Sequence, residues 1–230
     1  MIVTITGADD SVDVSELAKL SREFPFVEWA ILISASRGGT TRYPSAAWLA
    51  ALHLVARLRQ KSGEQLLLAA HLCGSVARQW WQDGRSSYLS PLFQRIQING
   101  YDVGFEGKLA ELADREGRRF ILQARSAESF SDCCADAIAI SHGATVLYDP
   151  SGGAGKRAAW PKRLRSYGVD FGIAGGIGPD NIAEAVNVAV QLGARWIDME
   201  SGVRDERDHF DLGRVRSVLE TVAALFKVTL

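Results

Sequence analysis

The sequence alternates between two kinds of segment eight times, and this repetition constrains the fold more than any other feature. Short apolar or β-branched runs, which predict strands, occupy residues 2–6, 27–34, 65–71, 95–99, 118–124, 144–148, 169–174 and 194–199. Longer amphipathic stretches, which predict helices, occupy residues 15–23, 46–61, 75–82, 107–117, 127–140, 156–167, 180–193 and 211–226. Apolar strands separated by helices indicate a parallel sheet that is covered by helices.

The number of these units favours a closed barrel. Eight strand–helix units in 230 residues fit a compact (β/α)8 barrel, or TIM barrel, which leaves no edge strand exposed. An open doubly wound sheet is the alternative. The chain shows no linker and no shift in composition, so we expect one (β/α)8 barrel domain over residues 1–230.

Charge and cysteine content restrict the partners and the compartment. The formal net charge of −1 gives no electrostatic case for binding nucleic acid or a charged membrane surface. No apolar run approaches the ~20 residues that span a bilayer, and the N-terminus lacks a basic leader segment. The three cysteines, Cys73, Cys133 and Cys134, do not form a disulfide framework. We therefore expect a cytoplasmic protein, as a monomer or a homodimer.

Two glycine-rich loops follow the last two predicted strands. Gly175 and Gly176 follow the seventh strand, and Ser201 and Gly202 follow the eighth. In barrels of this class, phosphate commonly binds on the loops after strands seven and eight, where small residues let backbone N–H groups approach its oxygens. The alternative is that these glycines only make tight turns. Two such loops at the two expected positions favour phosphate.

A third glycine cluster, at residues 146–158, places a carboxylate after the sixth strand. It matches the dinucleotide fingerprint at Gly153 and Gly155, but a lone match in the sixth of eight units is weak. Asp149 ends the strand and points toward the mouth of the barrel, where it can serve as a general acid or base. Its alternative role is an Asx turn or a helix cap before Gly152.

Three further side chains lie at or after the ends of predicted strands: Arg42 in the loop after the second strand, and His71 and Cys73 at the end of the third. Arg42 can grip a substrate carboxylate or be an ordinary solvated loop arginine. His71 and Cys73 are two residues apart and share a face, as a base and thiolate pair or as a partly buried structural pair. No spacing resembles a zinc site, so we expect no bound metal.

The C-terminal third resembles the phosphoribosylanthranilate isomerase family of tryptophan biosynthesis, whose members are (β/α)8 barrels. The segments VLYDPSGGAGK, GIAGGIGPDNIAEAV and IDMESGVRD follow the family pattern closely. Weaker similarities, TITG, TTRYPS and QING, occur earlier in the chain and in the family's order.

The resemblance implies a reaction and a set of residues. Family members carry out an Amadori rearrangement of a phosphorylated sugar derivative, from amino-aldose to amino-ketose, without any cofactor. By resemblance Asp149 is the acid that protonates the ring oxygen, and Arg42 grips the substrate. Asn99 stands at the histidine position of the family's substrate-binding QLHG segment. The implied phosphate-binding residues are Gly175, Gly176, Ser201 and Gly202.

One position departs from the family. Thr6 stands where the family has the cysteine that removes the C2 proton, and a threonine hydroxyl is too weak an acid to supply an alkoxide base. The sequence therefore predicts low native isomerase activity that Thr6→Cys would raise, unless another residue replaces the base. The substitutes considered from sequence are Asp9, His71, Cys73 and Glu200. The alternative functions are a diverged lyase or epimerase on another sugar phosphate, which would use His71 or Cys73, and a catalytically silent phosphosugar-binding protein.

Overall fold

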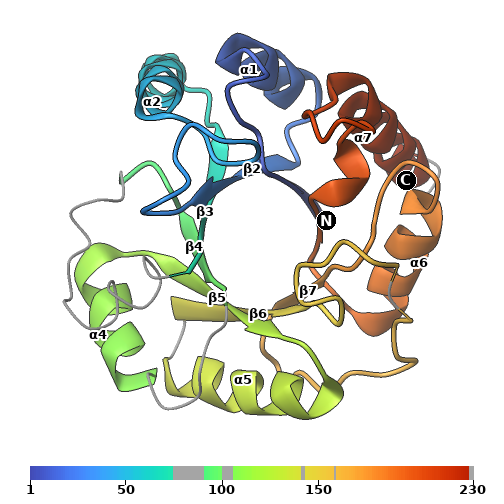
Figure 1. Cartoon of the computed structure of the whole chain (residues 1–230). Coiled ribbons are helices and arrows are strands. Elements are labelled where there is room, and N and C mark those ends of the chain that lie inside the picture. The colour runs from blue at the N-terminus through green and yellow to red at the C-terminus, as the bar shows by residue number, and fades with distance from the viewer. Residues whose placement is uncertain (75–90, 100–105, 141–142, 158, 228–230) are drawn as a thin grey trace.

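Eight parallel strands form a closed ring in the computed structural model, and the helices surround the ring on its outside (Figure 1). The structure describes residues 1–74, 91–99, 106–140, 143–157 and 159–227. The strands are β1 (Ile2–Thr6), β2 (Val27–Ile33), β3 (Leu67–Leu72), β4 (Arg95–Ile98), β5 (Arg119–Ala124), β6 (Ala144–Tyr148), β7 (Phe171–Ile173) and β8 (Trp196–Met199). Each strand pairs in parallel with the next, and β8 pairs with β1. The predicted (β/α)8 barrel is confirmed, and the open sheet is excluded.

The helices pack their apolar faces against the strands. They are α1 (Val14–Glu23), α2 (Ala46–Lys61), α4 (Glu106–Glu116), α5 (Ala127–Ala139), α6 (Ile182–Leu192) and α7 (Leu212–Lys227). Leu17, Phe130 and Val218 are fully buried examples, one each from α1, α5 and α7. Ser126 closes a capping box at the start of α5, and Gly193 ends α6 in the left-handed conformation. The helix predicted at residues 75–82 lies outside the described residues.

The helix predicted over residues 156–167 is wrong. None of its described residues is helical. Pro161 explains this, because proline lacks an N–H donor and disfavours helical geometry in the residue before it, here Trp160. The Trp160 indole N–H instead donates to the carbonyl oxygen of Ala174 at 3.0 Å, just beyond the end of β7. The segment is therefore a loop that packs onto the mouth of the barrel.

The amino-terminal half of the barrel interior contains an ion pair. The Arg95 guanidinium donates to both carboxylate oxygens of Glu28, at 2.8 and 2.5 Å, and Glu28 also accepts from the hydroxyl of Thr4. The same guanidinium lies 4.4 Å from the ring centroid of Trp196. Trp196 packs in turn with the apolar side chains of Ile121, Leu147 and Ala174. The polar site described below therefore rests on a filled interior.

Separating this ion pair should destabilise the fold. Arg95→Met leaves the buried Glu28 carboxylate without its partner, and we expect the free energy of unfolding to fall by ~3–5 kcal/mol. The double variant Glu28→Leu, Arg95→Met should recover most of the loss, because it buries no unpaired charge. Denaturation in urea measures both.

The matched control is Arg195→Met, which breaks an exposed ion pair with Asp170. This change should lower the free energy of unfolding by about 1 kcal/mol or less. Equal losses in the single and double barrel variants would contradict the prediction.

Candidate active site

A cleft lies at the carboxyl ends of the strands, where the barrel opens. Its volume, counted as the positions that the centre of a water molecule can occupy, is about 60 Å³. Its polar lining comprises Thr6, His71, Gln97, Asn99, Gln123, Asp149, Ser151, Asp198, Glu200 and Ser201, together with Gly175, Gly176 and Gly202. We call it the inner cleft.

A wider outer cleft, about 730 Å³ by the same measure, adjoins the inner one. Arg37, Arg42, Tyr43, Cys73 and Asp208 are among the residues that line it. The two clefts share Asn99, Gly153 and Glu200. All ten site residues predicted from the sequence line one cleft or the other: Arg42 and Cys73 line only the outer, and Asn99 lines both.

Thr6 hydrogen-bonds to a carboxyl group that the sequence analysis missed. Its hydroxyl donates to Asp198 Oδ1 at 2.7 Å, and both side chains are buried. β1 and β8 are neighbours, with Ile5 paired to Met199, so the two ends meet although 192 residues separate them in the chain. The signal for Asp198 was present as an ionisable residue inside an otherwise apolar strand.

The Asp198 carboxyl titrates far from its ordinary range. Burial raises the pKa of Asp198 to about 7, and the negative charges of Glu200, Asp149 and Glu28 add to the rise. The hydrogen bond from Thr6 acts in the opposite direction, because it stabilises the ionised form. At neutral pH the group exchanges readily between its acidic and basic forms.

His71 is buried beside Asp198 but is not ion-paired with it. Its Nε2 lies 4.0 Å from Asp198 Oδ2 and has no hydrogen-bond partner among the described residues. Burial, and then the positive charge of Arg95, lower the pKa of His71 to about 3. The imidazole is therefore neutral at physiological pH.

Cys73 and His71 do not form the side-chain pair that the sequence left open. The Cys73 sulfur receives a hydrogen bond from the Asn99 amide at 3.1 Å and lies 3.7 Å from the backbone carbonyl oxygen of His71. Burial raises the pKa of the Cys73 thiol, which keeps it protonated. Asn99 is held from its other side by Gln97, whose amide donates to Asn99 Oδ1 at 2.9 Å.

Asp149 both closes a turn and faces the inner cleft. Its Oδ1 accepts from the N–H and the hydroxyl of Ser151, at 3.1 and 2.7 Å. Its Oδ2 accepts from the Gly153 N–H at 2.8 Å and from the Gln123 amide at 2.9 Å. The Asx turn considered from sequence is therefore present, and the four donors fix the position of the carboxyl group.

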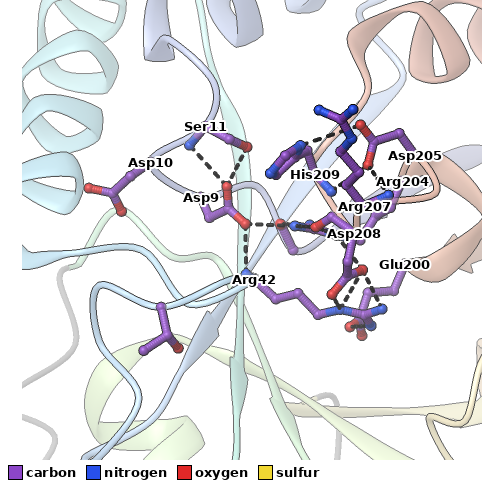
Figure 2. A network of polar contacts seen from close by, with 12 residues as sticks. Asp9, Asp10, Ser11, Arg42, Glu200, Arg204, Asp205, Arg207, Asp208 and His209 are labelled. Carbon is purple, nitrogen blue, oxygen red and sulfur yellow. Dashed lines mark hydrogen bonds and ion pairs between the residues drawn. The ribbon is translucent and has the colours of Figure 1, made fainter.

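Arg42 already binds two carboxylates (Figure 2). Its Nε and Nη2 donate to Asp208 at 2.7–3.1 Å, and its Nη1 donates to Glu200 at 2.5 Å. These contacts raise the pKa of Arg42. The buried Arg204 guanidinium bonds to the Asp9 carboxylate and to the backbone of Asp208. Ion pairs thus join the loops after β1, β2 and β8.

The glycine loops are shaped by close packing and leave amides free. A Cβ at Gly202 would lie 1.9 Å from the carbonyl oxygen of Ile177, and one at Gly176 would lie 2.4 Å from the backbone nitrogen of Arg157. Among the residues that the structure describes, no acceptor takes the N–H groups of the four predicted phosphate-binding residues, which are Gly175, Gly176, Ser201 and Gly202. Packing alone demands glycine at two positions, and the amides remain available to an anion.

Two kinds of feature are absent from the described part of the chain. It contains no group of three or more His, Cys, Asp or Glu side chains placed to hold a metal ion. It also contains no helix that is long and apolar enough to cross a membrane.

Fold and site together define the class: a (β/α)8 barrel with a polar cleft at the carboxyl ends of its strands and glycine loops after β7 and β8. The family model for N-(5'-phosphoribosyl)anthranilate (PRA) isomerase matches residues 96–221. That match covers more than half of the chain, and the protein belongs to this family. The resemblance drawn from its motifs is confirmed.

Individual relatives match over shorter or more distant stretches. N-(5'-phosphoribosyl)anthranilate isomerase of Campylobacter jejuni subsp. jejuni serotype O:6 is 39% identical over 79 residues, which span 33% of this chain and only 37% of the relative. The crystal structure of phosphoribosyl anthranilate isomerase from Thermus thermophilus has a TM-score of 0.67 at 17% identity and covers 98% of this chain and 100% of that one. A phosphoribosyl anthranilate isomerase in complex with reduced 1-(o-carboxyphenylamino)-1-deoxyribulose 5-phosphate has a TM-score of 0.59 at 14% identity, and covers 96% and 97%. These two structures share the barrel fold of this chain.

The raised pKa of Asp198 predicts a pH-dependent stability. The carboxyl ionises near 3.8 in the unfolded chain and near 7 in the folded protein, so the folded state binds more protons between these values. Stability conferred by the protonated group is then lost as the pH rises from about 4 to about 7. Asparagine has the same shape and does not titrate. We expect Asp198→Asn to gain melting temperature relative to the unmodified protein across this interval, and the difference to level off above it.

Thermal unfolding across this pH range measures the difference. Asp170→Asn, which removes an exposed carboxylate, is the control for the loss of one charge. A difference that stays constant with pH would show that Asp198 ionises alike in both states.

Proposed function

We propose that this protein isomerises N-(5'-phosphoribosyl)anthranilate to the corresponding amino-ketose, without a cofactor. The observation that carries the proposal is that one cleft joins the Asp149 carboxyl to the free amides of both glycine loops. An amino-aldose phosphate needs both, because its phosphate must be anchored while a proton reaches its ring oxygen. Membership of the isomerase family supports the same reaction.

The phosphate group would bind at the β7 and β8 loops. The amides of Gly175, Gly176, Ser201 and Gly202 supply donors, and the amino-terminal end of α6 follows the first loop with a favourable dipole. Asn181 braces this loop: its side chain accepts from the Gly178 N–H and donates to the carbonyl oxygen of Gly176. The donors are therefore held in place before the ligand arrives.

The anthranilate ring would occupy the outer cleft, whose volume suits a small aromatic group. Arg42 lies there, but its donors are committed to Asp208 and Glu200. A substrate carboxylate would take the place of Glu200 at Nη1, because Asp208 holds the other side of the fork by three hydrogen bonds. Asn99, which borders both clefts, would contact the substrate between its two ends.

The compartment and assembly are also part of the proposal. All three cysteines are unpaired, which supports a reducing compartment such as the cytoplasm. We propose a monomer or a homodimer there, acting on a phosphorylated small molecule rather than on nucleic acid or a membrane.

Removing the proposed acid should abolish most of the activity. Asp149→Asn keeps the size of the side chain but cannot donate a carboxyl proton, and we expect kcat for phosphoribosylanthranilate to fall by ~10²–10⁴-fold. Steady-state conversion of the purified protein measures this. The exposed Asp170→Asn change serves as the control. The opposite result would be an unmodified protein that binds reduced 1-(o-carboxyphenylamino)-1-deoxyribulose 5-phosphate, here called the reduced product analogue, without converting the substrate. That result would support a catalytically silent binding protein.

The phosphate site can be tested by charge. Ser201→Asp puts a negative charge beside the proposed phosphate position and should weaken binding of the reduced product analogue by about tenfold or more. Ser201→Asn, similar in size but neutral, is the matched control. Calorimetric titration measures both, and the dephosphorylated analogue should show no difference between the two variants. Equal affinities of the variants for the phosphorylated analogue would place the phosphate elsewhere.

A further inference from the structure

The inner cleft offers few groups able to take a proton from carbon. Its titratable lining residues are His71, Asp149, Asp198 and Glu200. Asp149 is assigned to the ring oxygen in the proposed reaction, and Glu200 lies at the border with the outer cleft, where the anthranilate end of the substrate would bind. His71 is buried, and its Nε2 faces Asp198 rather than a ligand position of its own.

The earlier candidates outside this cleft are also occupied. Asp9 is bound by the Arg204 guanidinium at 2.7 Å and by Ser11, and it does not line the inner cleft. Cys73 lines only the outer cleft and is hydrogen-bonded to Asn99. Elimination therefore leaves Asp198.

We propose that Asp198 is the general base that removes the C2 proton, and that Thr6 is a positioning residue whose hydroxyl orients the Asp198 carboxylate. This inference rests on the proposed isomerase function. Asp198 Oδ1 lies 2.7 Å from Thr6 Oγ1, the position from which the C2 proton would be taken in the family reaction. A carboxylate one strand away thus replaces the missing thiolate, and the threonine gains a role that does not require it to ionise.

The reaction balances with these groups alone. Asp149 gives its proton to the ring oxygen as the C1–O bond breaks, and the nitrogen lone pair forms a C1=N iminium. Asp198 then takes the C2 proton, the C–H electron pair becomes the C1=C2 bond, and the iminium electrons return to nitrogen. In the final tautomerisation C1 gains a proton and the C2 hydroxyl loses one, which restores both carboxyl groups. No oxidant or reductant is consumed.

The surroundings of Asp198 suit a base that works at neutral pH. The groups that act on it are the Thr6 hydroxyl from β1, Glu28 from β2, His71 from β3, and the carboxylates of Asp149 and Glu200. Burial and the three carboxylates raise the pKa of Asp198 to about 7, near the optimum for general-base catalysis. His71 is neutral and adds no opposing charge.

The first experiment compares Asp198→Asn with the unmodified protein. The asparagine Oδ1 still accepts the Thr6 hydrogen bond, so the fold should be retained, but it cannot take a proton. We expect kcat for phosphoribosylanthranilate to fall by ~10²–10⁴-fold, while affinity for the reduced product analogue changes by about threefold or less. The surface change Asp170→Asn should leave both values as they are in the unmodified protein.

The second experiment tests the role of Thr6. Thr6→Val removes the hydroxyl at constant shape, and because its hydrogen bond lowers the pKa of Asp198, the acidic limb of kcat/KM should move to higher pH. Thr6→Ser keeps the hydroxyl and should keep the limb where it is. A purely structural role for Thr6 would lower activity equally at every pH.

The outcomes separate this inference from the proposed function. Conversion by the unmodified protein together with undiminished kcat in Asp198→Asn would overturn the base assignment and leave the isomerase function standing. An acidic limb that does not move in Thr6→Val would overturn the positioning role. Binding of the analogue with no conversion by the unmodified protein would instead refute the isomerase function, and the base assignment with it.

Discussion

The parallel pairing of β1 with β8 organises both the barrel and its candidate site. It closes the sheet, so that every strand has two neighbours and the carboxyl ends of all eight point to one mouth. The same pairing brings Thr6 to within 2.7 Å of Asp198, across 192 residues of sequence. An open sheet with the strands in this same order would leave these two side chains on opposite edges. The pairing that closes the barrel therefore also brings Thr6 to Asp198, the proposed base.

Burial of charge links the interior of the barrel to the chemistry at its mouth. The Glu28–Arg95 pair fills the amino-terminal half, where barrels usually place branched apolar side chains, and it is satisfied by Thr4 and by stacking on Trp196. The charges of this pair also act on ionisable side chains nearer the mouth of the barrel. Arg95 disfavours protonation of His71, and Glu28 disfavours ionisation of Asp198. A residue that stabilises the barrel thus also contributes to the protonation states of the candidate site.

The loops around the mouth are held in two different ways. Ion pairs centred on Arg42 and Arg204 join the loops after β1, β2 and β8 (Figure 2), whereas the loops after β6, β7 and β8 meet by close backbone packing at glycines. The packed side presents free amides, which suit an anion that must be held rigidly. In the proposed reaction, a substrate carboxylate would replace Glu200 at Arg42 on the ion-paired side. The β8 loop belongs to both, so Glu200 and Ser201 lie where the two sides meet.

The eight strands could be predicted from the residues alone, with none of their ends displaced by more than two residues, because a buried parallel strand is a run of apolar residues. The sequence also placed the candidate site, since residues that end such strands share one mouth. The other features depend on contacts between distant parts of the chain. Residues 156–167 have a helical pattern, but Pro161 and the contact of the Trp160 indole with Ala174 make them a loop. Asp198 was missed because a strand pattern does not say which side chains face the barrel interior, and its hydrogen bond to Thr6 exists only once the last strand has closed against the first.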